Sequence, residues 1–557
     1  MLPPPPPPES GENPSLAECL RLLEAVPAAA ASSPAFRRHW PSISASLAAL
    51  SSALASPAFP PAAPLLAPLA AALAALLSAA TDAPRLGHLH TVSLLSSSAA
   101  SLAQLAADAR LLAAPPAPSA SADATAGGED ALISRLRMGS AASRAAALEE
   151  LAASAASLPA SSAAAAVSAV ASLLDSTGGD LLPSSRELAV SVLAAFASSD
   201  PARRFLAEES AAVVPHLCRA LESGGAGAAE HACAALLPLT ASSRDASAAV
   251  AARGGVAALL AACAGGTPAT QAAAAGVLRN LAAFPDLLHW FSDEGRGAVM
   301  PLLLQLVSLG TPRAREMALW CLQNLTAGDG DDGQRLKVEA FQEGALVCVK
   351  DFLDGIRGGG GGDDDEPALA PAMGLLRNMA SFRYIAENAV STGFVPHVAA
   401  ALGSDRSTTR VEAALALAEL CGNTDKLARG HGELEDAVPR LVWMMEAKPV
   451  AERDAAARAL AALLAASGAC RKLFRKDERG IVNAVQLLDP LGPPGVERRF
   501  AVAVLLAVSQ SRRCRKQMVA AGACAFLQGL MVAEVEGAKK LAECLGKGKM
   551  LGVFPRT

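Results

Sequence analysis

Aromatic side chains are scarce in this chain: they make up 3% of its 557 residues, and Tyr384 is the only tyrosine. Large rings usually dominate a globular core, so one compact core built on aromatic packing is not expected. Hydrophobic residues nevertheless reach 52% and charged residues only 18%, which argues against global disorder. The abundant alanine and leucine are good helix formers. The composition therefore predicts an all-α protein.

Signatures of catalysis and metal binding are also missing. The sequence has no GxSxG, P-loop or HExxH motif, its 11 cysteines form no CxxC pair, and its eight histidines show no ligand spacing. A net charge of −5 gives no general attraction to nucleic acid or to an anionic membrane. We therefore expect a protein that is not an enzyme and that has no metal, cofactor, small-molecule substrate or nucleic-acid partner.

Several cysteines lie inside or beside apolar helical segments, which is typical of buried, reduced thiols. These are Cys218, Cys233, Cys321, Cys421 and Cys524. The first residues, MLPPPPPPES, lack the basic and apolar regions of a secretory signal. A cytoplasmic and/or nuclear location is expected.

One segment is long enough to suggest a membrane span, because residues 41–81 carry no charge and 62–80 are apolar. The segment is mostly alanine, however, and it contains Pro64 and Pro68. We interpret it as a buried helix of a soluble bundle, and membrane association as the alternative.

The composition divides the chain into five parts. Residues 1–12 form a proline-rich, disordered tail and 13–113 a helical domain, with 114–129 as a linker. Residues 130–550 form a repeat array, which contains a disordered acidic, glycine-rich insertion at 358–366, and 551–557 form a tail.

Within the array, a short helical segment recurs with one anchor leucine in each copy. The anchors are Leu148, Leu193, Leu236, Leu278, Leu322, Leu376, Leu417, Leu460 and Leu505. Successive anchors are 41–45 residues apart, except for 54 between Leu322 and Leu376. The fixed spacing predicts about nine structural repeats with one insertion.

A second landmark, an apolar helix that opens with proline, follows the same period. Its prolines are Pro215, Pro301, Pro396 and Pro439. Proline suits the first helical position because its fixed φ is already helical and its missing N–H has no partner there. The excess length again falls between Pro301 and Pro396, where GGGGGDDDE interrupts the chain.

A unit of this length, with a short helix, a glycine corner and two longer helices, resembles the armadillo repeat. The corners begin at Gly254, Glu343, Thr392 and Ala521, whereas AEESAAVVPHL before Pro215 has no glycine. The resemblance implies a right-handed armadillo-type α-solenoid. One unit cannot bury its apolar face alone, so neighbours must stack.

The helical domain at 13–113 also looks like the domain that precedes the U-box in plant U-box/armadillo proteins. A linker of this size cannot fold as an independent domain, so the ubiquitin-ligase module has no place between the two regions. Ligase activity is not expected to follow from this resemblance.

In armadillo proteins, asparagines of the third helices grip the backbone of an extended peptide. Here Asn280, Asn324 and Asn378 each stand two residues after an anchor leucine. An asparagine amide can both donate to and accept from a peptide group. Trp320 lies one helical turn before Asn324 on the same face. We predict a peptide-binding groove that also includes Arg279 and Arg377; the alternative is that the asparagines only bridge neighbouring helices.

Charged loops carry weaker signals. The acidic loops 328–333 and 358–366 could attract a basic partner, but we favour solvated, disordered loops. The basic runs 471–476 and 511–517 could bind phosphate, but solvated turns between helices are favoured.

The expected function is that of a non-catalytic scaffold or adaptor whose groove holds an extended segment of another protein. A second possibility is a regulator or substrate adaptor of ubiquitin signalling that lacks a U-box. A membrane-tethered or nuclear-transport-type adaptor is a third.

Overall fold

The computed structural model describes residues 16–546, with gaps at 32–35, 38, 57–64, 83–87, 114–123, 140, 156–157, 176–182, 224, 294–297, 358–362, 425–431 and 493. The predicted tails, 1–12 and 551–557, lie outside the described residues. So do residues 114–123 of the predicted linker and 358–362 of the insertion.

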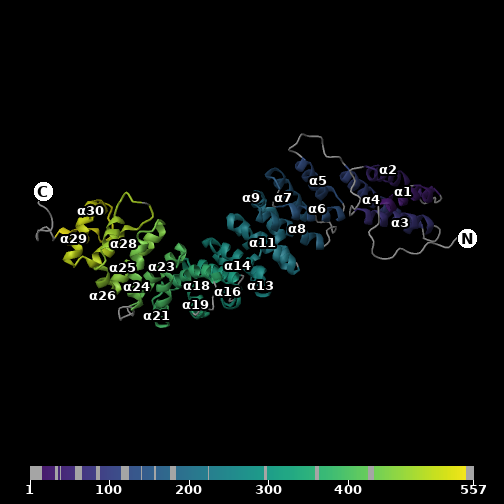
Figure 1. Ribbon diagram of the computed structural model, residues 1–557. Helices are drawn as coiled ribbons and strands as arrows, with labels where there is room; N and C mark the ends of the chain where they lie inside the picture. Colours follow the sequence, from purple (N-terminus) through teal and green to yellow (C-terminus); the bar gives the residue numbers. More distant parts are fainter. Residues whose placement is uncertain are drawn as a thin grey trace. The chain divides into compact units, whose positions relative to one another are not determined.

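The described residues form helices and no strands, and the chain divides into two compact units, Met1–Arg253 and Gly254–Thr557 (Figure 1). The first unit contains α1 (Leu16–Ala31), α2 (Trp40–Leu54), α3 (Leu66–Asp82), α4 (His88–Ala113), α5 (Ala124–Met138), α6 (Ala141–Ser154), α7 (Ala160–Asp175), α8 (Pro183–Ser198), α9 (Asp200–Glu208), α10 (Ser210–Ser223), α11 (Ala226–Ser242) and α12 (Arg244–Ala251).

The second unit contains α13 (Gly255–Gly265), α14 (Pro268–Ala282), η2 (Pro285–Leu287), α15 (Leu288–Asp293), α16 (Val299–Leu309), α17 (Pro312–Leu325), α18 (Asp331–Gln342), α19 (Ala345–Arg357), η3 (Asp363–Ala368), α20 (Leu369–Met379), α21 (Arg383–Ser391), α22 (Val395–Ala401), α23 (Ser407–Asn423), α24 (Glu433–Met444), α25 (Val450–Ala466), α26 (Gly468–Phe474), α27 (Glu478–Gln486), α28 (Arg498–Val508), α29 (Arg512–Ala520), α30 (Ala523–Val532) and α31 (Ala538–Gly546). Here η2 and η3 are 3₁₀ helices.

At the start of the chain, α1 to α4 pack around a shared apolar core. The uncharged segment that suggested a membrane span supplies α3, whose Leu69, Leu73 and Leu76 are fully buried in this core. In the described part of the chain, no single helix combines the length and apolar character needed to cross a bilayer. Among the described helices, the bent pair α12 and α13 passes the test by length and composition alone.

The linker prediction is wrong at its C-terminal end. Helix α5 begins at Ala124, inside the predicted linker 114–129, and packs against α6 and α7. The glycines in ATAGGED suggested a break, because glycine is a poor helix former, but the helix includes them.

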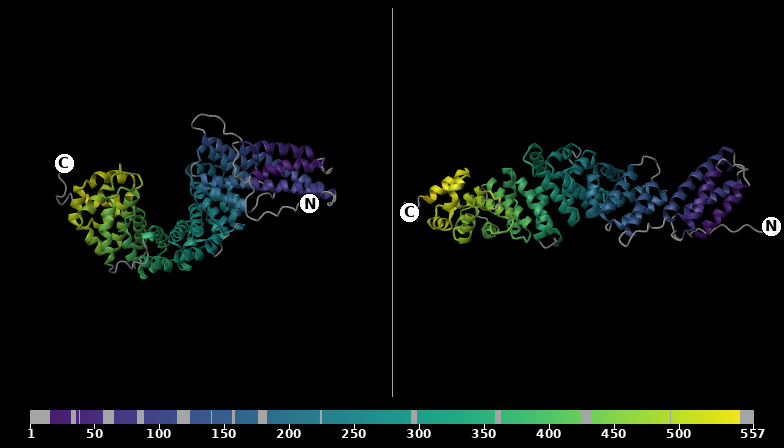
Figure 2. Two further views of the ribbon diagram at one scale, coloured as in Figure 1. Left: turned by 45° about the vertical axis from the view of Figure 1, so that its right-hand side comes forward. Right: turned by 90° about the horizontal axis from the view of Figure 1, so that it is seen from above.

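Further along, the helices pack in chain order as helical repeats. Every anchor leucine lies on a helix and is at most 1% exposed; these helices are α6, α8, α11, α14, α17, α20, α23, α25 and α28. In the second unit, α14, α17, α20, α23, α25 and α28 contact one another in succession. Figure 2 shows this teal-to-yellow part of the chain from two directions, with its helices side by side.

Glycine corners set the direction of the second helix in several repeats. Gly254, Gly344, Gly393 and Gly522 all have a positive φ, between 74° and 89°. A side chain would strain the backbone in this left-handed region, so glycine is required there. The predicted corners are confirmed.

The proline prediction holds for one helix and is wrong for others. Pro396 lies in the first turn of α22, and Pro301 is the third residue of α16. Pro215 and Pro439 instead lie inside α10 and α24, which begin earlier than the sequence suggested.

The acidic loops are more ordered than predicted. Asp365 and Glu366 belong to η3, where Asp365 binds Arg315 at 2.7 Å and Glu366 pairs with Arg406. In the other loop, Asp329 contacts the buried ammonium group of Lys337 at 3.3 Å. These carboxylates form ion pairs with cations of neighbouring helices. The sequence pattern alone does not reveal such pairs.

The prediction of buried cysteines is confirmed for four of the five residues named. Cys218, Cys233, Cys321 and Cys421 are buried as expected, but Cys524 is exposed, because it faces outward on α30.

The basic runs form short helices. Arg471 donates to Ala465 O at 2.9 Å, near the end of α25. Arg515 donates to Ser509 O at 2.7 Å, at the end of α28. Each arginine therefore caps the helix that precedes its own. Arginine donors suit the unpaired carbonyls at a helix end.

The corner geometry predicts opposite effects for two glycines that bound or occupy α19. Gly344→Ala should lower the free energy of unfolding by about 1 kcal/mol, because alanine is strained at a φ of +84°. Gly355→Ala should raise it by about 0.5 kcal/mol, since alanine favours a helix interior. Neither added methyl group meets an atom within 4 Å. Urea denaturation measures both, and equal effects would contradict the backbone explanation.

A buried histidine predicts acid sensitivity. His397 Nε2 lies 2.9 Å from Asp354 Oδ1, and burial lowers the pKa of His397 below its ordinary value of 6.5; Asp354 opposes this, while Lys350 and Arg357 add to it. The unfolded chain therefore takes up this proton more readily than the folded chain. Stability should fall as the pH drops below 6.5, levelling off once the folded histidine is also protonated. His397→Gln should remove this component from a series of denaturation curves; an unchanged pH profile would refute it.

Candidate functional site

The candidate site lies on the third helices of the second unit, named here the third-helix layer: α14, α17, α20, α23, α25 and α28. These helices contact one another in order, and their anchor leucines point into the core. Positions one residue after an anchor lie at the edge of this buried face, because neighbouring positions on a helix are about 100° apart. Arg279, Arg377 and Ala461 are accordingly partly exposed. All six predicted groove residues belong to this layer.

Two of the predicted asparagines join consecutive repeats. Asn324 Nδ2 donates to the backbone oxygen of Arg279 at 3.0 Å, and Asn378 Nδ2 donates to that of Gln323 at 2.8 Å. Both acceptors stand one residue after an anchor leucine, in the last turn of the preceding third helix. Carbonyl groups in a last turn lack a full set of helical partners, so a side-chain donor satisfies them.

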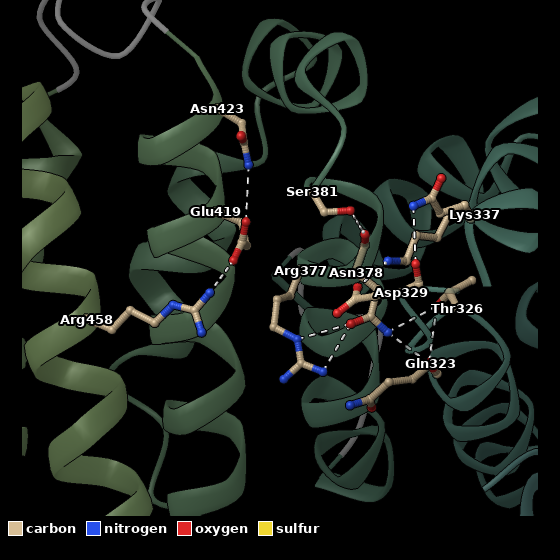
Figure 3. Close-up of polar contacts among 11 residues, drawn as sticks. Gln323, Thr326, Asp329, Lys337, Arg377, Asn378, Ser381, Glu419, Asn423 and Arg458 are labelled. Carbon is tan, nitrogen blue, oxygen red and sulfur yellow. Dashed lines mark hydrogen bonds and ion pairs between the residues drawn. The ribbon is translucent and has the colours of Figure 1, made fainter. Parts of the chain in front are cut away.

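The amide of Asn378 is fully occupied within the protein (Figure 3). Its Nδ2 also reaches Thr326 Oγ1 at 3.1 Å, and its Oδ1 accepts two bonds from Arg377. A primary amide offers two donors and about two acceptor positions, so nothing is left for a peptide. For Asn378, the geometry supports the bridging role that was the alternative in the sequence analysis.

Asn280 repeats part of this arrangement. It is buried, and its Oδ1 accepts from Nε and Nη2 of Arg279 at 3.1 and 2.7 Å. In both Arg–Asn pairs, the asparagine oxygen thus holds the guanidinium group of the arginine that precedes it in sequence. The group presented by these positions is the guanidinium group, because Arg279 and Arg377 are partly exposed. Trp320 is also partly exposed, on α17.

A longer contact connects three third helices. Gln323 of α17 passes directly over Gly374 of α20, and its Nε2 donates to Oε1 of Glu412 on α23 at 3.2 Å. A methyl group on Gly374 would come within 2.3 Å of the Gln323 side chain, so only glycine allows the crossing. Burial raises the pKa of Glu412, and Arg377, whose Nη1 lies 2.7 Å from Glu412 Oε2, opposes that shift.

A groove on the layer lies farther along the chain, over α23, α25 and α28. This groove has a volume of about 450 Å³. Small residues form part of its wall, and charged residues and a phenylalanine form the rest: Ala418, Glu419, Gly422, Asn423, Arg458, Ala461, Ala462, Arg499, Phe500, Ala503, Leu506, Glu536 and Gly537.

Charged side chains in the groove are held in place by one another. Glu419 joins Arg458 at 2.6 Å and Asn423 at 3.1 Å, as Figure 3 shows. The guanidinium carbons of Arg458 and Arg499 lie 5.7 and 4.7 Å from the centre of the Phe500 ring, which is cation–π distance. The groove therefore offers fixed donors beside a partly exposed ring.

Glu419, Arg458 and Phe500 were not among the site residues predicted from the sequence. A usable signal was Phe500, a rare aromatic residue that stands five positions before an anchor leucine. Aromatic residues make up only 3% of the chain, so a ring on a repeat helix is an uncommon feature.

Chemically, the layer offers hydrogen-bond donors, carboxylates and a ring rather than a reactive centre. Among the described residues, no group of three or more histidine, cysteine, aspartate or glutamate side chains is arranged to hold a metal ion. The arrangement is suited to binding a polar segment of another molecule.

Comparison with known proteins identifies the fold but no family. No family model and no curated protein matches the chain. The crystal structure of an engineered protein from the Northeast Structural Genomics Consortium is similar to it, with a TM-score of 0.59 and 23% identity, over 75% of this chain and 98% of the other. A second engineered protein from the same consortium covers 45% of this chain at 20% identity, with a TM-score of only 0.37. The first similarity shows a helical repeat fold and nothing about activity.

The bridging geometry makes a prediction about stability. Asn378→Ala should lower the free energy of unfolding by about 1–2 kcal/mol, because it leaves the buried acceptors Gln323 O and Thr326 Oγ1 without this donor. Asn388→Ala, on the exposed face of α21, is the control and should change it by less than about 0.5 kcal/mol. Equal midpoints in urea for both variants would show that the bridge contributes nothing.

Proposed function

We propose that this protein is a non-catalytic scaffold of the armadillo type, with about nine right-handed repeats, that binds an extended segment of another protein along the third-helix layer. One observation carries the proposal: the groove over α23, α25 and α28. It crosses three successive repeats, which is the direction that an extended chain would follow.

The chemistry of the groove supports a peptide ligand. Backbone groups of a peptide need fixed donors and acceptors. Asn423 uses its N–H groups on Glu419 and on Ala380 O, so this set offers the remaining N–H donors of Arg458 and the oxygens of Glu419 and Asn423. Small side chains such as Ala461 and Ala503 leave room for a backbone to approach the helices. Phe500 offers an apolar surface for a side chain of the partner.

The polarity of the walls also fits a peptide segment better than a small metabolite. Sites for small molecules enclose most of the ligand and are mainly apolar. This groove is bounded by three parallel-running helices and by four charged residues: Glu419, Arg458, Arg499 and Glu536. A partner that brings its own polar backbone is better matched to such walls.

The test is to fill the groove without disturbing the core. Ala503 is exposed on α28 and lines the groove, whereas Ala261 is exposed on α13, outside the third-helix layer. Ala503→Tyr should reduce binding of the partners by at least about tenfold, and Ala261→Tyr should leave it unchanged. Proximity labelling in the native cell with the full chain and both variants identifies the partners, and titration with the recovered segments measures affinity.

The controls separate the possible results. Circular dichroism should show equal helix content in all three proteins. Identical partner sets and affinities for the full chain and the Ala503→Tyr variant would overturn binding in the groove. Equal losses in both tyrosine variants would place binding elsewhere.

A further inference from the structure

Two Arg–Asn pairs occupy equivalent positions in the third-helix layer, and this equivalence allows a comparison within one protein. Arg279 and Arg377 each stand one residue after an anchor leucine, Leu278 and Leu376. Each guanidinium group donates through Nε and Nη2 to Oδ1 of the asparagine that follows it. The two arginines are therefore held in the same way.

Their third contact differs. Nη1 of Arg377 lies 2.7 Å from Glu412 Oε2, and Glu412 stands five residues before the anchor Leu417. The residue five positions before the anchor Leu322 is Met317, and Nη1 of Arg279 lies 3.4 Å from its Sδ. Where Arg377 has a carboxylate, Arg279 thus has a thioether, which is a weak, uncharged acceptor.

The surroundings leave a positive charge at Arg279. Arg313 lies nearby and Glu316 is close as well, but Glu316 binds Arg313 at 2.6 Å. Arg279, Arg313 and Glu316 together carry one net positive charge, whereas Arg377 and Glu412 carry none. Burial, and then Arg313, lower the pKa of Arg279, while Glu316 raises it. A half-buried cation with neutral hydrogen-bond partners is costly, and an added carboxylate would stabilise it.

The position of Arg279 faces the route of a bound segment. In α23 and α25 the residues one position after the anchors, Ala418 and Ala461, line the groove. Arg279 has the same register on α14, in the same continuous layer of helices. We infer that Arg279 pairs with an aspartate or glutamate side chain of the extended protein segment that the third-helix layer binds. This inference rests on the proposed function and adds the chemistry of the partner.

The experiment begins with peptides that bind the full chain, selected from a displayed library of random linear sequences. Each selected peptide is remade with its acidic residues changed one at a time to asparagine or glutamine. Fluorescence polarisation then gives the affinity of each peptide for the full chain and its variants. At one acidic position, the change should weaken binding to the full chain by about tenfold, as expected for a partly shielded ion pair.

Variants of the protein locate the partner of that acid. Met317→Glu supplies the internal carboxylate that Arg377 already has, and Arg279→Gln removes the charge. In both, the acidic peptide and its amide counterpart should bind with equal affinity. Arg377→Gln is the matched control, because Arg377 is already neutralised by Glu412, and it should retain the tenfold difference. If Met317→Glu fails to fold, Arg279→Gln still decides the question.

Each outcome supports or overturns the inference. An undiminished tenfold difference in Arg279→Gln would place the acid elsewhere and overturn it, as would peptides with no acidic requirement. In either case, loss of those peptides by Ala503→Tyr would leave the proposed function standing. If no peptide binds the full chain, both proposals fail.

Discussion

The structure depends on burying leucine between repeats. Each anchor leucine is at most 1% exposed, and it reaches that state only when a neighbouring repeat covers it. A single unit of three short helices would leave these side chains in water, so the free energy of folding arises largely at the seams. This is why alanine is so common in the chain. Small residues let the helices approach closely, and the leucines then fill the space between them.

Polar groups at the seams give the stack its register. Asn324, Asn378 and Asn423 each donate to a backbone carbonyl group of the preceding repeat, at 2.8–3.0 Å. Buried ion pairs do the same between helices; Arg410 binds the completely buried Glu452 at 2.6 Å. Hydrophobic contact alone would tolerate small shifts of one repeat against the next. A directional bond to a single carbonyl group does not, because a displaced amide loses that bond.

Periodic features could be predicted from the sequence, and contacts between distant residues could not. The anchor leucines and the glycine corners were recognisable because spacing and backbone sterics act locally. The ion pair of Asp365 could not be predicted, since its partner Arg315 is 50 residues away and nothing in the acidic run indicates that contact. The asparagine register pointed to Asn324 and Asn378, but a donor suited to a peptide is equally suited to a neighbouring helix. The groove around Phe500 escaped notice because its residues share no repeated motif.

Gln323 has a consequence for how the second unit comes apart. In most repeat proteins each unit touches only its immediate neighbours, so loss of order spreads one step at a time. Gln323 reaches past α20 to Glu412 on α23, and it can do so because Gly374 on α20 has no side chain in its path. Three helices are thereby linked by a single side chain. The middle of this unit should act as one cooperative block, and fraying that starts at α31 should halt when it meets α23.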